Sequence, residues 1–203
     1  QHLQRAVDDR QSPARPLSLA VASAWLVQVI QGDQCRVPQR LLDDGSEQEA
    51  RDEVQAVLEA RAQRLSREGV LPIGLIGELW QDQLVRDLVP VRSAWLALCS
   101  RFKEEAPKLA LSLDFGGIHL DDWIDKLRAG EGGTVWLLQM SSRGLDKKQA
   151  LRADKLIGAW LRQLAAAASG VEVTGYLVAR DAIVTMAPLA QSLAHAQLGT
   201  LVA

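Results

Sequence analysis

The segment 134–141, Thr-Val-Trp-Leu-Leu-Gln-Met-Ser, is nearly continuously apolar, and it constrains the fold more than any other part of the chain. A central strand that is buried on both faces has this pattern, whereas a strand with one solvated face alternates between apolar and polar residues. A helical pattern over 146–168 follows, ends at Gly170, and is succeeded by a strand-like segment over 171–179. This order of strand, helix and strand predicts a parallel pair inside a mixed sheet.

Two helices and a hairpin precede the central strand. Ser46 and Glu49 form a capping box, and apolar residues then recur at three- and four-residue spacing as far as Gly69. A second helical run covers 75–102, and Pro90 should kink it or split it in two. The other expected elements are a strand over 109–113, its hairpin partner over 118–127, a strand over 182–186 and a helix over 189–195.

The composition limits the class of protein. A chain of 203 residues with 48% hydrophobic and 24% charged residues is typical of a globular domain, and its net charge of −2 argues against nucleic-acid binding through bulk positive charge. Cys35 and Cys99 are too few for a disulfide scaffold, which favours a reducing, cytoplasmic location. No apolar run approaches the roughly 20 residues that span a bilayer, and no signal peptide is visible. Because the sequence does not begin with Met, we expect a piece of a longer protein.

Acidic residues gather on the predicted hairpin, just before the central strand: Asp114, Asp121, Asp122 and Asp125. A magnesium-dependent nuclease of the restriction-endonuclease type places its first aspartate in this region and an acid-x-Lys triplet on the next strand. Mg²⁺ needs carboxylate oxygens, and the attacking water needs a nearby lysine. The next strand offers Gln139-Met140-Ser141 instead, so we expect a degenerate site without a metal or other cofactor.

The sequence gives less support to a zinc site, a phosphate-binding loop or a serine nucleophile. The histidines are scattered, the glycine-rich segments 69–77 and 130–133 lack the Gly-Lys-Ser/Thr ending of a phosphate loop, and no Gly-x-Ser-x-Gly elbow occurs. Basic residues follow the central strand at Arg143, Lys147, Lys148, Arg152 and Lys155. They form either a solvated helix face or a patch that contacts nucleic-acid phosphates or an acidic partner. The tryptophans at 80, 95, 136 and 160 suit a core, and one or two could anchor a subunit interface.

Three segments, in the same order and at similar spacing, resemble the C-terminal region of RecC, the gamma subunit of the exodeoxyribonuclease V (RecBCD) helicase–nuclease. Residues 64–78, Arg-Leu-Ser-Arg-Glu-Gly-Val-Leu-Pro-Ile-Gly-Leu-Ile-Gly-Glu, resemble its helix followed by Gly-x-Leu-Pro-x-Gly-x-x-Gly-Glu. Residues 117–125 resemble its Gly-hydrophobic-x-hydrophobic-x-Gly-Trp-Leu stretch, and 160–170 its Trp-Leu-x-x-Leu…Ala-Ser-Gly helix end.

The resemblance implies an α/β fold of the restriction-endonuclease type that lacks catalytic residues, over 46–203, with 1–45 as an N-terminal segment of uncertain assignment. By its place in the pattern, Asp125 corresponds to the first metal-binding aspartate of active relatives, and Gln139 and Ser141 to their acid and lysine. The implied role is non-catalytic: docking to RecB-like and RecD-like subunits and handling DNA in double-strand-break repair and homologous recombination. In that role, Arg143, Lys147, Lys148 and Arg152 are candidate contacts to DNA or a partner.

Two alternatives stay open. One is a divergent magnesium-dependent nuclease that uses Asp114 or Asp122 with Lys147 or Lys148. The other is an interaction domain unrelated to recombination, because a fold alone does not determine function. If the chain is part of a subunit, we expect an exposed apolar patch larger than the few hundred Å² that is usual for a monomer.

Overall fold

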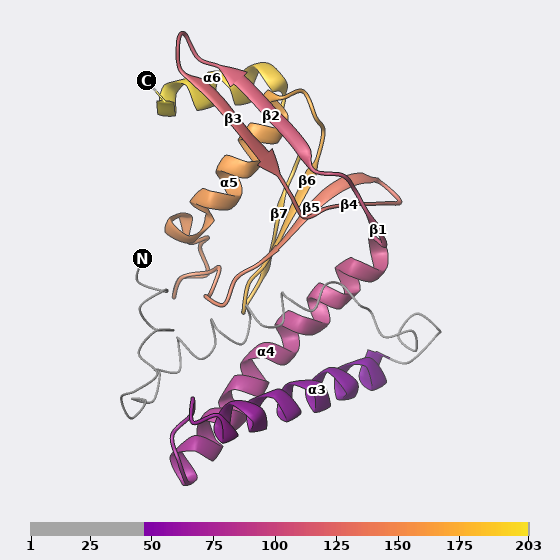
Figure 1. Cartoon of the computed structure of the whole chain (residues 1–203), viewed down its shortest axis with the longest axis vertical. Helices are drawn as coiled ribbons and strands as arrows, with labels where there is room; N and C mark the ends of the chain where they lie inside the picture. The colour runs from indigo at the N-terminus through magenta and orange to yellow at the C-terminus, as the bar shows by residue number, and fades with distance from the viewer. Residues whose placement is uncertain (1–46, 203) are drawn as a thin grey trace.

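Figure 1 shows the computed structural model of the chain, which describes residues 47–202. The first predicted helix is present, although Ser46 of its capping box lies outside these residues. None of the helices in this range has the length and apolar character needed to cross a membrane. The helices are α3 (Glu47–Arg67), α4 (Leu75–Arg101), α5 (Ala153–Ala168) and α6 (Gln191–Val202), and the strands are β1 (Glu104–Glu105), β2 (Leu109–Asp114), β3 (His119–Ile124), β4 (Leu127–Gly130), β5 (Gly133–Gln139), β6 (Thr174–Val178) and β7 (Ile183–Met186).

The main sheet has the order β1-β4-β5-β6-β7, and a separate hairpin pairs β2 with β3. β5 is therefore the central strand, as its apolar sequence predicts. It runs parallel to β6, the strand that follows α5, and antiparallel to β4. The fold is thus mixed α/β, with the parallel pair expected from the strand–helix–strand order.

The two faces of β5 are buried against different helices (Figure 1). Trp136 is fully buried and belongs to the same core cluster as Leu164 of α5. Val135 and Leu137 point to the opposite face, because successive side chains alternate along a strand, and they cluster with Phe102 at the end of α4. The burial of both faces explains why this segment does not alternate in polarity.

The predicted strand 118–127 is interrupted, which is a correction to the expected hairpin. β3 ends at Ile124, opposite Leu109 of β2, whereas Leu127 begins β4 and pairs with Trp136. Between them, Lys126 has a left-handed backbone with φ of 55°. This conformation redirects the chain, so the two parts of one apparent strand enter different sheets.

The helix α4 runs unbroken from Leu75 to Arg101, so the expected split at Pro90 does not occur. The proline removes one helical hydrogen bond, the one that would reach the carbonyl of Arg86, and its ring lies on the exposed side of the helix. Packing holds both halves of α4 in line. The first half packs on α3 through Leu84 and Leu88, and the second half packs on the sheet through Leu98 and Phe102.

The C-terminal end of α4 is held by a buried arginine from the sheet. The guanidinium of Arg128 on β4 donates through Nε to the carbonyl of Phe102 and through Nη2 to that of Lys103, the latter at 2.6 Å. A cation is favourable there because the carbonyls at a helix C-terminus carry partial negative charge. Gly130 permits the close approach, since a Cβ at that position would lie 2.6 Å from the carbonyl oxygen of Arg101.

The later helices differ from their predicted bounds. α5 begins at Ala153 rather than at 146, because the side chain of Asp146 accepts hydrogen bonds from the backbone N–H groups of Lys148 (2.7 Å) and Ala150 (2.9 Å). Such local bonds compete with helix formation. α6 extends to Val202 rather than ending at 195, and it buries Ala194 and Leu198 in the core beside α5.

A buried polar network ties β5 to α5. The indole Nε1 of Trp136 donates to Oε1 of Gln163 at 2.8 Å, and Nε2 of Gln163 donates to the carbonyls of Val173 and Ala187, each also at 2.8 Å. Gly175 on β6 makes room for the indole, since a Cβ there would lie 1.9 Å from its Cζ2 atom. The network fixes the position of α5 over the central strand.

We expect Gln163→Leu to lower the free energy of unfolding by about 2–4 kcal/mol, because it leaves the buried N–H of Trp136 and the buried carbonyl of Val173 without their partner. Urea unfolding followed by tryptophan fluorescence measures the change. Gln63→Leu, on the exposed surface of α3, is the matched control and should change stability by less than about 0.5 kcal/mol. Equal stability of the Gln163→Leu protein and the wild type would contradict the structural role of the network.

Candidate functional site

The three predicted nuclease positions lie near the same end of the β4–β5 pair. Asp125 immediately precedes the Lys126 turn, and the carbonyl of Lys126 accepts a hydrogen bond from the N–H of Leu137 at 3.3 Å. The antiparallel register therefore places Asp125 beside the second half of β5, the half that ends at Gln139. Ser141 follows two residues later, and both it and Gln139 are partly buried.

The carboxylate of Asp125 is engaged by Arg162 from α5. Nη2 of Arg162 donates to Oδ1 of Asp125 at 2.9 Å, and Nη1 donates to its backbone carbonyl at 2.8 Å. The hydrogen bond from Arg162 lowers the pKa of Asp125, which keeps the carboxylate ionised. A guanidinium therefore lies where a cation would have to bind. Sequence reasoning missed this role, although Arg162 lies inside the Trp-Leu-Arg-Gln-Leu segment that resembles RecC.

Two of the four candidate basic contacts are already paired with carboxylates. Nε of Arg143 lies 2.9 Å from Oδ2 of Asp181. Burial raises the pKa of Asp181, but hydrogen bonds from Arg143 and from the N–H groups of Gly144 and Leu145 outweigh it, so the pKa is lowered. Arg152 pairs with Asp154 at 3.0 Å, and this contact lowers the pKa of the Asp154 carboxyl. Both arginines thus help to shape the segment that leads into α5.

Lys147 and Lys148 lie on the exposed turn before α5, not on a helix face as expected, and they form no ion pair within the described range. The acidic residues that the nuclease alternative requires lie elsewhere. Asp114 and Asp122 belong to the β2–β3 hairpin, which lies beside the later part of α5, whereas the turn precedes its first residue (Figure 1). The structure does not bring these acids and lysines together.

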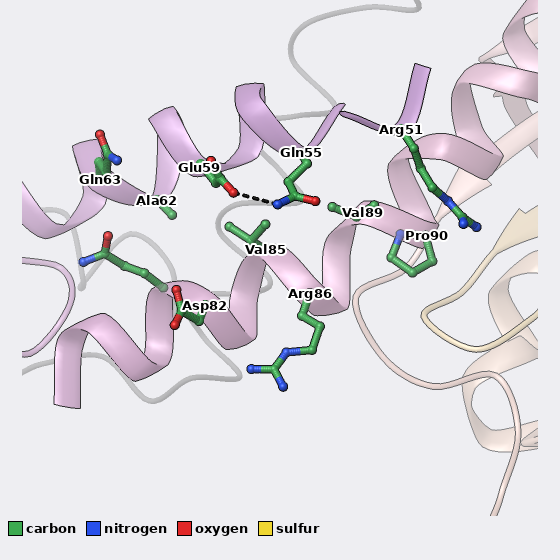
Figure 2. A pocket seen from close by; sticks show the side chains of 11 residues that line it. Arg51, Gln55, Glu59, Ala62, Gln63, Asp82, Val85, Arg86, Val89 and Pro90 are labelled. Atoms are coloured by element: carbon green, nitrogen blue, oxygen red, sulfur yellow. Dashed lines mark hydrogen bonds between the residues drawn. The ribbon is translucent and has the colours of Figure 1, made fainter. Parts of the chain in front are cut away.

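A groove of about 710 Å³ lies between α3 and α4, and sequence reasoning did not identify it (Figure 2). Ala62 and Val85 are buried at its base, and polar and charged side chains form its rims. Figure 2 shows the exposed pair Gln55 and Glu59, joined by a hydrogen bond of 2.8 Å along α3. The signal in the sequence is the four-residue spacing of polar side chains along both helices, which places them on one face.

Exposed apolar side chains gather where the turn between α3 and α4 leads into the first residues of α4. Ile73 is 98% exposed, Leu75 71%, Ile76 59% and Leu79 57%. We call these four residues the apolar tip. Three of them, Ile73, Leu75 and Ile76, lie within the segment 64–78 on which the strongest part of the RecC resemblance rests, and Leu79 follows directly after it. Soluble monomers seldom expose apolar side chains in such a cluster.

We expect Asp125→Asn to lower the free energy of unfolding at pH 7 by up to about 1 kcal/mol, the range for partly exposed ion pairs. Because the pKa of Asp125 is lowered in the folded chain, this stabilisation is present above the ordinary Asp pKa of about 4 and is lost as the pH falls below it. Urea unfolding at pH 7, 5 and 3 measures the difference. The same substitution in an Arg162→Met background should show no such pH dependence, and an undiminished difference at pH 3 would contradict the ion-pair role.

The crystal structure of SSO0001 is similar at 16% sequence identity and a TM-score of 0.33, over 73% of this chain and 74% of that one. No curated protein matches the chain. The model of the family described as RecC C-terminal domain matches residues 29–203, which include all of the described residues and confirm the resemblance seen in the sequence. The chain therefore belongs to the RecC C-terminal domain family, and this membership implies a role within a subunit of the RecBCD complex.

Proposed function

We propose that this chain is a non-catalytic docking and DNA-handling domain of a RecC-type subunit, with a restriction-endonuclease-like fold whose active site is degenerate. The observation that carries the proposal is the contact between Asp125 and Arg162. An active nuclease of this type needs its first aspartate free to bind Mg²⁺. Here the guanidinium of Arg162 already supplies the positive charge next to that carboxylate.

The neighbouring positions support the same conclusion. Gln139 offers a neutral amide where a second carboxylate is required, and Ser141 offers a hydroxyl where a lysine would assist the attacking water. Neither side chain can balance the charge of a divalent cation. The end of the β4–β5 pair is suited to holding α5 in place, not to cleaving a phosphodiester.

The surface supports a docking role. The apolar tip exposes four large side chains to solvent, and burying one such side chain in an interface contributes roughly 1.5–3 kcal/mol. We propose that the tip contacts a RecB-like or RecD-like subunit. Lys147 and Lys148, on the exposed turn before α5, are the proposed contacts to DNA phosphates, because two flexible ammonium groups there are not paired with carboxylates of the described range.

The degenerate site predicts that the chain does not cleave linear duplex DNA in the presence of Mg²⁺ or Mn²⁺. Incubation of labelled duplex with the purified chain and denaturing gel electrophoresis test this outcome. Asp125→Ala and wild type should behave alike. Metal-dependent cleavage that Asp125→Ala abolishes would replace the proposal with the divergent-nuclease alternative.

The docking role predicts that the chain co-elutes with the RecB-like or RecD-like subunit of its source organism in size-exclusion chromatography after co-expression. Ile73→Asp together with Ile76→Asp should weaken this association by about tenfold or more, since two interface side chains become charged. Val57→Asp, at a 49% exposed position on α3 away from the tip, is the control and should co-elute normally. Unchanged co-elution of the tip variant would show that docking uses another surface.

A further inference from the structure

The groove between α3 and α4 has an ordered charge pattern along its length. On α3 the rim follows a four-residue spacing, Arg51, Gln55, Glu59 and Gln63, and on α4 it continues through Asp82, Arg86 and Pro90. Because the two helices run antiparallel, Glu59 lies at the level of Asp82 and Arg51 at the level of Pro90, with Arg86 between Asp82 and Pro90, as Figure 2 shows. One end of the groove is therefore acidic and the other is basic.

These charges are not neutralised within the described part of the chain. No ion pair there involves Arg51, Arg86, Glu59 or Asp82, and all four residues are exposed on the rims. Arginine binds a carboxylate with two parallel N–H donors, so the basic end suits an acidic side chain. The acidic end suits a lysine or arginine. The buried base at Ala62 and Val85 adds an apolar surface between the two ends.

We propose that this groove binds a segment of a partner polypeptide that carries an acidic side chain at the Arg51–Arg86 end and a basic side chain at the Glu59–Asp82 end. A nucleic acid fits less well, because its regularly spaced phosphates would meet two carboxylates at one end. A polypeptide can match both signs. The proposal rests on the proposed function, since the partner is a subunit of the same assembly.

The test uses the complete RecC-type polypeptide of the source organism, co-expressed with its RecB-like and RecD-like subunits. The photocrosslinking residue p-benzoylphenylalanine is placed in the groove by Gln63→p-benzoylphenylalanine and, as a control on the exposed surface of α3 away from the groove, by Ala60→p-benzoylphenylalanine. After irradiation, mass spectrometry identifies the crosslinked peptide. The expected result is one partner segment of mixed charge, captured by the groove probe and not by the control.

Charge reversal then tests the recognition itself. Arg51→Glu with Arg86→Glu should lower the crosslink yield by about tenfold, because each reversal replaces an attraction with a repulsion. Arg67→Glu with Lys108→Glu makes the same change in net charge outside the groove and should leave the yield unchanged. An intact assembly with no groove crosslink, or with a crosslink to DNA, would overturn the groove proposal while leaving the proposed function. Failure of the wild-type subunits to assemble would instead overturn the proposed function.

Discussion

The structure depends on the burial of β5 on both of its faces. A strand of this kind requires a layer of helix on each side, and here α5 covers the face with Trp136 while the end of α4 covers the face with Val135 and Leu137. The indole of Trp136 would leave a buried N–H unpaired, which Gln163 prevents while also satisfying two loop carbonyls. One residue pair thus fixes the distance and the rotation of α5 over the sheet, and α5 in turn carries Arg162 to Asp125.

Much of the architecture could be predicted from periodicity. The apolar run 134–141, the helix after it and the returning strand determine a central strand with a parallel neighbour, and the structure has both. The failures come from single residues whose effect is not periodic. The left-handed backbone at Lys126 divides one apparent strand between two sheets, and the side-chain bonds of Asp146 delay the start of α5.

The candidate site was predictable only in those features that depend on residue identity and not on tertiary packing. Sequence reasoning could see that Gln139 and Ser141 lack the charges of a metal site, because that depends on residue identity alone. It could not see that Arg162, 37 positions after Asp125, would contact that carboxylate, since the contact depends on how α5 lies over the sheet. The groove between α3 and α4 could not be predicted either. Its lining residues are ordinary surface residues of two helices, and only the packing of one helix against the other brings them together.

The continuity of α4 links two distant parts of the domain. A helix of 27 residues is about 40 Å long, and it joins the apolar tip at one end to the face of the sheet that carries Val135 and Leu137 at the other. Arg128 on β4 holds the far end through the carbonyls of Phe102 and Lys103. One unbroken element therefore connects the exposed side chains of the tip to the buried central strand.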